Sequence, residues 1–182
     1  TQSLLKLLDI ILHRNAFRFN GEYWLQTLGV AMGGSASPEI SDIVVHVVEK
    51  EILKLEPDCI VKWLRYRDDI FCVWHGSAAE LQLFVSQANR LFDNFHFKYE
   101  WSDNKIHFLD TIVSKGPNFH CNGYLDFCTY TKPTDTFQYL LRSSCHPVPV
   151  FNAFIKGELL RHVRNCSSLA SFNEKKDRKS VV

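Results

Sequence analysis

The chain has 182 residues, which suits one domain, or one domain and part of another. Its composition is 46% hydrophobic with 14 Phe, enough for a packed core, and no apolar run is long enough for a membrane span. The net charge of +1 does not indicate a polyanionic partner, but the charge is uneven. Residues 1–131 carry 12 Lys+Arg against 16 Asp+Glu, whereas residues 132–182 carry 9 against 4. The basic C-terminal third fits either a nucleic-acid-binding face or an ordinary solvated surface.

Six cysteines show neither a CxxC pair nor the spacing of a disulfide framework, which fits free thiols in a reducing compartment. A zinc site is an alternative for some of them, although the usual ligand spacing is missing. Its candidate ligands are His120, Cys121, Cys128, Cys145 and His146. No signal peptide is visible, and both ends of the chain have the character of a fragment.

The chain begins with a strongly apolar segment, residues 4–15, for which we expect a helix. Two short β-prone runs follow, at 16–19 and 22–26. They flank Asn20-Gly21, the dipeptide most typical of a two-residue hairpin turn. The sequence therefore predicts a helix followed by a hairpin.

A glycine-rich segment, residues 29–38, comes next. We predict that Ser37 caps a helix, that Pro38 is its first residue and that it continues to about Leu55. Glycines let a ligand approach the backbone closely, and a helix N-terminus favours anions. A turn whose only role is to start a core helix explains the same residues.

Residues 60–74 have the pattern of a strand, a turn and a second strand, with two adjacent aspartates, Asp68 and Asp69, at the bend. Adjacent carboxylates repel unless a cation neutralises them. Mg²⁺ prefers oxygen ligands and is often held by one or two carboxylates together with substrate phosphates. The hairpin is thus a candidate for half of a two-metal phosphoryl-transfer site, or an ordinary solvated acidic turn.

After this hairpin, Ser77-Ala78-Ala79-Glu80 predicts a capping box and residues 78–92 a helix with one apolar stripe. Aromatic residues alternate over 95–101, which predicts a strand, and after a turn residues 106–113 predict a returning strand.

A further hairpin is expected to turn at Asn122-Gly123, with residues 124–130 as its second arm. Loop-like sequence then leads to a helix over about 150–165, and a new polar helix begins near the end of the chain.

Several of these segments stand in a characteristic order. They read Phe17-Arg18-Phe19-Asn20-Gly21, Gln26-x-x-Gly29-x-x-Met32-Gly33-x-x-x-Ser37-Pro38, Tyr66-Arg67-Asp68-Asp69, Phe108-Leu109-Asp110, and Tyr130-Thr131-Lys132-Pro133-Thr134-Asp135-Thr136 with Ser143-Ser144-Cys145-His146-Pro147. Over residues 4–166 they resemble a reverse transcriptase, most closely the Penelope-like retroelement group. The second segment is similar to motif B, the third to motif C, residues 78–101 to motif D, the fourth to the start of motif E, and the last to the entry into the thumb.

The resemblance implies an α+β fold. Residues 1–113 would form a partial polymerase palm, an antiparallel sheet with helices packed on one face. Residues 114–182 would form the palm–thumb connection and the beginning of a helical thumb. The implied function is an RNA-directed DNA polymerase that uses two Mg²⁺ ions, with an RNA template, a DNA primer and dNTPs as partners. The implied setting is intracellular, most naturally nuclear, without a membrane partner.

The resemblance also implies roles for individual residues. Asp68 would be a metal ligand with Asp69 in a supporting role, and Tyr66 would pack beneath the primer terminus. The residues implied to line the incoming nucleotide and template base are Met32, Gly33, Gly34, Ser37 and Pro38. Many relatives have Gln where Met32 stands, so contact there would be apolar or through the backbone.

Five basic residues of lesser weight complete the implied site. Lys98 or Lys105 would donate a proton to the leaving pyrophosphate, unless each is a solvated strand-end lysine. Phosphate contacts in the thumb would come from Lys132, Arg161 and Arg164, unless these are surface charges.

Motif A, the source of the third catalytic carboxylate, is missing from these residues and would lie upstream with the fingers. Asp9 lies within the apolar stripe of the first helix and does not fit that role. The isolated chain is therefore expected to be inactive. The alternatives are a non-catalytic nucleic-acid-binding remnant that uses the basic region, and a decayed copy without function.

Overall fold

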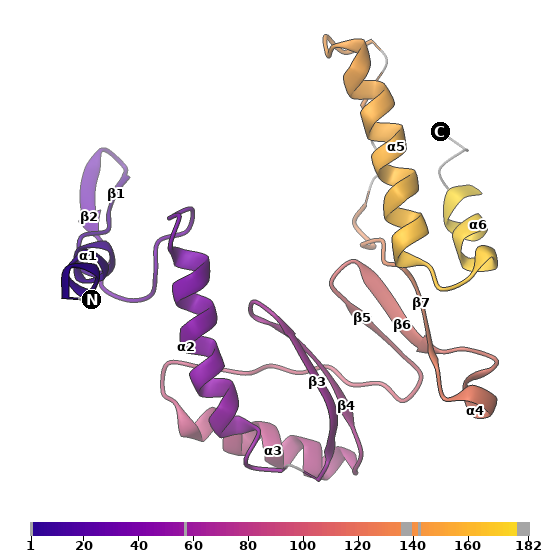
Figure 1. Cartoon of the computed structure of the whole chain (residues 1–182), viewed down its shortest axis with the longest axis horizontal. Coiled ribbons are helices and arrows are strands. Elements are labelled where there is room, and N and C mark those ends of the chain that lie inside the picture. Colours follow the sequence, from indigo (N-terminus) through magenta and orange to yellow (C-terminus); the bar gives the residue numbers. More distant parts are fainter. Residues whose placement is uncertain (1, 57, 136–139, 142, 178–182) are drawn as a thin grey trace. The chain divides into compact units, whose positions relative to one another are not determined.

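A computed structural model describes residues 2–56, 58–135, 140–141 and 143–177 of the chain (Figure 1). The fold is mixed α+β, with helices and small antiparallel sheets. The chain divides into two compact units, Thr1–Lys98 and Tyr99–Val182. The motifs predict a later division, at residue 113. The observed division is earlier because strands β5, Lys105–Phe108, and β6, Thr111–Lys115, pair with each other, and β6 pairs with β7, Leu125–Thr129, which joins residues 105–113 to the second unit. Among the described residues no helix is long and apolar enough to cross a membrane.

The first unit begins with helix α1, Gln2–His13, and the hairpin of β1, Ala16–Phe19, and β2, Glu22–Leu25. Both predictions are confirmed. The turn residues have positive φ, 50° at Asn20 and 87° at Gly21, the backbone conformation that this dipeptide favours. All residues of the two strands are exposed, and α1 contributes no fully buried residue.

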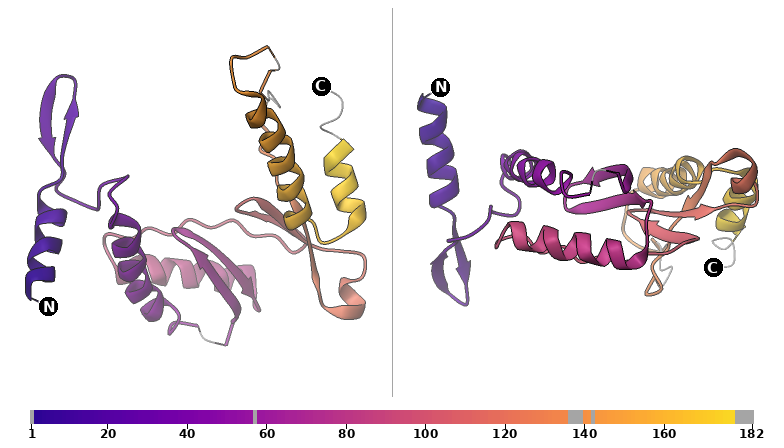
Figure 2. Two further views of the ribbon diagram at one scale, coloured as in Figure 1. Left: turned by 45° about the horizontal axis from the view of Figure 1, so that its top comes forward. Right: turned by 90° about the horizontal axis from the view of Figure 1, so that it is seen from below.

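The core of the first unit lies between helix α2, Ser37–Ile52, helix α3, Ala78–Leu91, and a hairpin (Figure 2). That hairpin consists of β3, Ile60–Tyr66, and β4, Asp69–Trp74, as predicted. Four apolar side chains of the described residues are fully buried, and all lie on the two helices: Val48, Ile52, Phe84 and Ala88.

The hairpin is joined to both helices through one tryptophan. The Trp63 ring meets Phe84 of α3 edge-on at 6.4 Å between centroids, and its Nε1 donates a hydrogen bond to Glu49 of α2. At the N-terminal end of α3, Ser77 and Glu80 form the expected capping box. Helix α2 ends at Ile52, three residues before the predicted end.

The predicted strand at 95–101 is wrong. The backbone of Phe97 bonds to a side chain instead of a neighbouring strand: its N–H donates to Asn89 Oδ1 at 2.6 Å, and its carbonyl accepts from Asn89 Nδ2 at 3.0 Å. Phe95 and Phe97 pack against the α2–α3 core, so the alternating aromatic residues reflect core contacts without strand pairing.

The second unit contains a three-stranded antiparallel sheet in the order β5-β6-β7. Its strands are β5, Lys105–Phe108, β6, Thr111–Lys115, and β7, Leu125–Thr129. The single strand predicted at 106–113 is therefore wrong. Leu109 has φ 52° and turns the chain, and Thr111 Oγ1 donates to the Phe108 carbonyl at 2.9 Å across that turn.

Asn122-Gly123 is not a hairpin turn, which corrects a third prediction. Residues Phe119–Asn122 form the short helix α4, and Gly123 ends it with φ 71° while its N–H donates to the Phe119 carbonyl. Glycine is the usual residue for such a left-handed helix end. The second arm, β7, does pair with β6, as expected of a returning strand.

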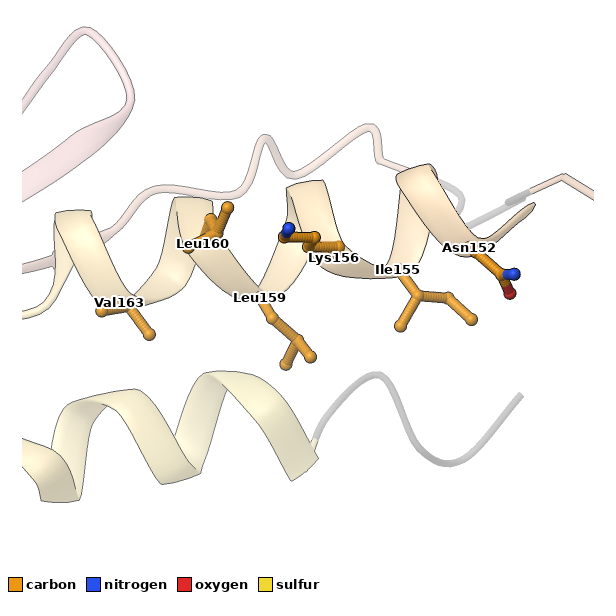
Figure 3. A pocket seen from close by; sticks show the side chains of 6 residues that line it. All are labelled: Asn152, Ile155, Lys156, Leu159, Leu160 and Val163. Carbon is orange, nitrogen blue, oxygen red and sulfur yellow. The ribbon is translucent and has the colours of Figure 1, made fainter. Parts of the chain in front are cut away.

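Two helices close the second unit, α5, Val148–Asn165, and α6, Leu169–Asp177. Helix α5 packs against β7, where His162 and Thr129 are both buried and Nδ1 lies 2.9 Å from Oγ1. Along another face of α5, Ile155, Leu159 and Val163 point to the same side and line a shallow groove (Figure 3). They are 42–58% exposed, so this apolar stripe is largely uncovered.

Candidate functional site

The acidic turn joins β3 to β4 in the first unit. Tyr66 pairs with Asp69, so Arg67 and Asp68 form the turn itself, and Arg67 has the unusual φ of 58°. Both aspartates are exposed. Among the described residues neither carboxylate has a hydrogen-bond or ion-pair partner, so both are open to a ligand from solvent.

The turn is tied to helix α2 by charged side chains. Asp42 Oδ1 accepts from Arg65 Nη1 at 3.1 Å, and Asp42 Oδ2 accepts from Arg67 Nη1 at 2.7 Å. Arg65 Nε lies 3.4 Å from Glu49 Oε2, and its Nη1 also donates to the Arg67 carbonyl at 3.0 Å. Arg65 and Glu49 are shielded, with side chains 14% and 13% exposed, so their ion pair is less screened than a surface pair.

This network was not predicted from the sequence, although the sequence contains a signal for it. Asp42 and Glu49 are two helical turns apart on one face of α2, and Arg65 and Arg67 are two residues apart in the sequence, a spacing typical of one strand face. Nothing in either local pattern, however, reveals that the two faces meet.

The glycine-rich loop leads into α2 at its N-terminal end. Gly29 and Gly33 have φ of 75° and 86°, which glycine adopts without strain. Ser37 is not the N-cap that we predicted, because its hydroxyl donates to the Ala31 carbonyl at 2.6 Å and closes the loop. The N-cap position is Ala36, which has no side-chain bond, while Pro38 lies in the first turn as expected.

Close packing within the loop leaves little room at one glycine. A Cβ on Gly34 would lie 2.5 Å from Ser37 Oγ, whereas a Cβ on Gly33 would have no atom within 4 Å. Met32 is fully exposed. The loop thus presents Met32 and the backbone of Gly33 to solvent, while Ser37 and Gly34 keep its shape.

The structure brings the loop and the acidic turn to the same half of α2. Asp42, which holds the turn, is five residues after Ser37, about 7.5 Å along the helix axis. A surface pocket of about 510 Å³ lies between α2 and the turn. Its lining residues are Asp42, Ile43, His46, Val47, Arg65, Tyr66 and Arg67.

The acidic turn alone is an incomplete metal site. In the part of the chain that the structure describes, no three His, Cys, Asp or Glu side chains are grouped so that they could hold a metal ion. This applies both to the magnesium site and to the zinc alternative. Asp68 and Asp69 supply free carboxylate oxygens, the ligand type that Mg²⁺ prefers, and they fit part of a ligand set. Asp42 is poorly suited to complete it, since each of its oxygens already accepts from an arginine whose positive charge repels a cation.

The remaining predicted residues lie in different environments. Tyr66 is 61% exposed and borders the pocket beside the turn. Lys98 lies at the end of the first unit and Lys105 at the start of β5, and both side chains are exposed.

Of the basic residues in the second unit, Lys132 and Arg164 are exposed. Arg161 is different, because its guanidinium lies 3.1 Å from Asp110 and 4.0 Å from Glu158. It links α5 to the β5–β6 turn and is less available to a phosphate. Thr136, the last residue of the first stretch of the expected thumb-entry motif, lies outside the described residues.

No protein-family model, curated protein or solved structure matches this chain. Function is therefore inferred from the residues themselves and from their arrangement.

Proposed function

We propose that this chain is part of an RNA-directed DNA polymerase of a retroelement, containing part of a palm and the beginning of a thumb. The observation that carries the proposal is the tight hairpin turn Tyr66-Arg67-Asp68-Asp69, with two free carboxylates, next to the helix that the glycine-rich loop opens. The order of the motifs along the chain supports the same function.

In this proposal the exposed carboxylate of Asp68 holds divalent metal, and Asp69 supports it. Bound Mg²⁺ would lower the pKa of a primer 3′-hydroxyl and stabilise the charge that develops on the α-phosphate. Tyr66, on the pocket wall beside the turn, packs beneath the primer terminus. Gly33 lets the incoming nucleotide approach the backbone, and Met32 offers an apolar contact to it.

The thumb portion binds the backbone of the template–primer duplex in this proposal. The exposed Lys132 and Arg164 are its best phosphate contacts, whereas Arg161 acts mainly through Asp110. Lys98 and Lys105 remain the candidates for the general acid. The third carboxylate comes from upstream sequence, so the isolated chain binds nucleic acid without extending a primer. The proposed setting is the nucleus.

The test is primer extension on an RNA template with the protein extended upstream through motif A. Asp68→Ala should lower the rate by at least about 10³-fold, because a lost metal ligand removes several kcal/mol of transition-state stabilisation. Asp58→Ala is the matched control, an exposed aspartate in the loop before β3, and should leave the rate unchanged.

Two results would contradict parts of this proposal. Equal extension by both variants would remove Asp68 from catalysis. No extension by the parent protein, with salt-sensitive RNA binding that survives Asp68→Ala, would indicate the non-catalytic binding protein instead.

A further inference from the structure

The carboxylate of Asp42 holds both arginines that flank Tyr66 in the acidic turn. Each of its oxygens accepts from a different guanidinium, Arg65 before Tyr66 and Arg67 after it. Arg65 also donates to the backbone carbonyl of Arg67, so the turn is held through side chain and main chain together. From this geometry we infer that Asp42 is a positioning residue, which holds the turn in the shape that presents Asp68 and Asp69 to a divalent cation. The cation-binding part of this inference rests on the proposed function.

Two features of the turn would favour its relaxation without this clamp, by which we mean the bonds of Arg65 and Arg67 to Asp42. Arg67 adopts φ 58°, a left-handed conformation that is strained for a residue with a Cβ. The adjacent carboxylates of Asp68 and Asp69 also repel each other. Both costs act at the exposed end of a two-stranded hairpin, and no third strand from the described part of the chain pairs with it.

The clamp has a firm base on α2. Glu49, two turns further along the helix, accepts from Trp63 Nε1 and lies 3.4 Å from Arg65 Nε. Trp63 itself packs against the core at Phe84. Glu49 thus holds the guanidinium of Arg65 on the side nearer the core. Asp42 bonds to the same guanidinium and also to Arg67, so it connects Arg67 to this fixed group. Each bond to Asp42 joins two charged groups, the stronger class of hydrogen bond.

The same geometry assigns Asp42 an indirect role. Each oxygen of Asp42 accepts from a guanidinium, and the positive charge of Arg65 and Arg67 beside this carboxylate disfavours a cation there, so Asp42 acts on Asp68 through the arginines. Because Asp42 lies in the second turn of α2, a shift of the glycine-rich loop at the start of that helix would reach the acidic turn by this route.

The test uses NMR of the 182-residue chain as wild type, Asp42→Asn and Glu51→Gln. The control removes the charge of an exposed carboxylate on the same helix, whose partner Lys54 is also on the surface. Two signals are measured: amide hydrogen exchange at Asp68 and Asp69, and the broadening of those amides by added Mn²⁺. Amide exchange at Phe84 in α3 reports on the core.

In Asp42→Asn, amide exchange at Asp68 and Asp69 should become about fivefold faster. The Mn²⁺ concentration that half-broadens these amides should also rise about fivefold. Both values follow because a partly exposed ion pair contributes up to about 1 kcal/mol. Exchange at Phe84, and all signals of Glu51→Gln, should stay within about twofold of wild type. If Asp42→Asn loosens the core, Arg67→Lys is the second variant. It keeps the positive charge at an exposed position and removes the planar guanidinium fork, and it should give the same rise in amide exchange at Asp68 and Asp69.

Unchanged turn exchange in both Asp42→Asn and Arg67→Lys would overturn the inference, and so would an equal rise at Phe84 in both. Faster turn exchange in the variants, with no Mn²⁺ broadening even in wild type, would support the clamp and count against the proposed metal site. Failure of the inference and failure of the proposed function are therefore separate results.

Discussion

Phe84 is the side chain whose removal should cost the first unit most. It is 4% exposed and lies between two tryptophans, with ring centroids 6.4 Å from Trp63 and 5.3 Å from Trp74. Truncation of a buried Phe to Ala typically costs 3–5 kcal/mol, part of it from the cavity that remains. Because few other side chains are fully buried here, few neighbouring side chains can shift to fill that cavity. We expect Phe84→Ala to lower the free energy of unfolding by about 3–4 kcal/mol.

The neighbouring Leu83 provides the matched control. It is 55% exposed on the same helix, and Leu83→Ala should change stability by less than about 1 kcal/mol. Urea unfolding followed by tryptophan fluorescence measures both variants, since Trp63 and Trp74 flank the altered site. If Phe84→Ala does not fold, Phe84→Leu keeps most of the volume and should cost about 1.5 kcal/mol or less. Equal urea midpoints for Phe84→Ala and Leu83→Ala would refute the assignment of this core.

Three further predictions concern separate sites. Hydrogen bonds from the Ser77 backbone and hydroxyl hold the pKa of Glu80 below its ordinary value, so their contribution to α3 is present at neutral pH and is lost as pH falls through that lowered pKa. In an NMR titration, Ser77→Ala should return the pKa of Glu80 toward 4.5, and an unchanged pKa would contradict the capping box. Burial raises the pKa of the Cys72 thiol to about 11. At pH 8 iodoacetamide should therefore modify the exposed Cys121 well before Cys72, which peptide mass spectrometry would show. Modification of Cys72 first would count against its burial. Gly123→Ala should destabilise the second unit by about 1 kcal/mol in urea unfolding, because φ is 71° there, and Gly123→Asn should cost less; no loss in either would argue against the left-handed end of α4.

Local sequence signals predicted the elements that depend on neighbouring residues. Asn20-Gly21 specifies its turn through backbone conformation, and Ser77 and Glu80 cap α3 within one helical turn. The acidic hairpin likewise follows from two β-prone runs around a polar bend. In each case the information lies within about fifteen residues.

The incorrect predictions concern segments in which distant contacts decide the structure. The alternating aromatics around Phe97 are typical of a strand, yet Asn89 takes both of its backbone hydrogen bonds. The turn at Leu109 has no Gly, Asn or Pro to mark it. Asn122-Gly123 does mark a turn, but that turn is the end of helix α4 and not a β-hairpin.

The candidate site shows the same division. Asp68 and Asp69 could be found from their adjacency and from the strands around them. Asp42 could not, because its partners are 23 and 25 residues away and only the packing of α2 on the hairpin brings them together. The part of a site that presents ligands was visible in sequence, whereas the part that holds them in place was not.

The small core of the first unit has a consequence for identifying what the protein binds. With so few fully buried side chains, its folding free energy is expected to be small, and a modest gain then moves the melting temperature noticeably. A ligand at 100 times its Kd adds about 2.7 kcal/mol to the stability of the state that binds it. For a unit of this size, each kcal/mol corresponds to a shift of about 4–8 °C. A thermal-shift screen of divalent cations, nucleotides and short RNA–DNA duplexes should therefore detect a true ligand of this unit with unusual sensitivity.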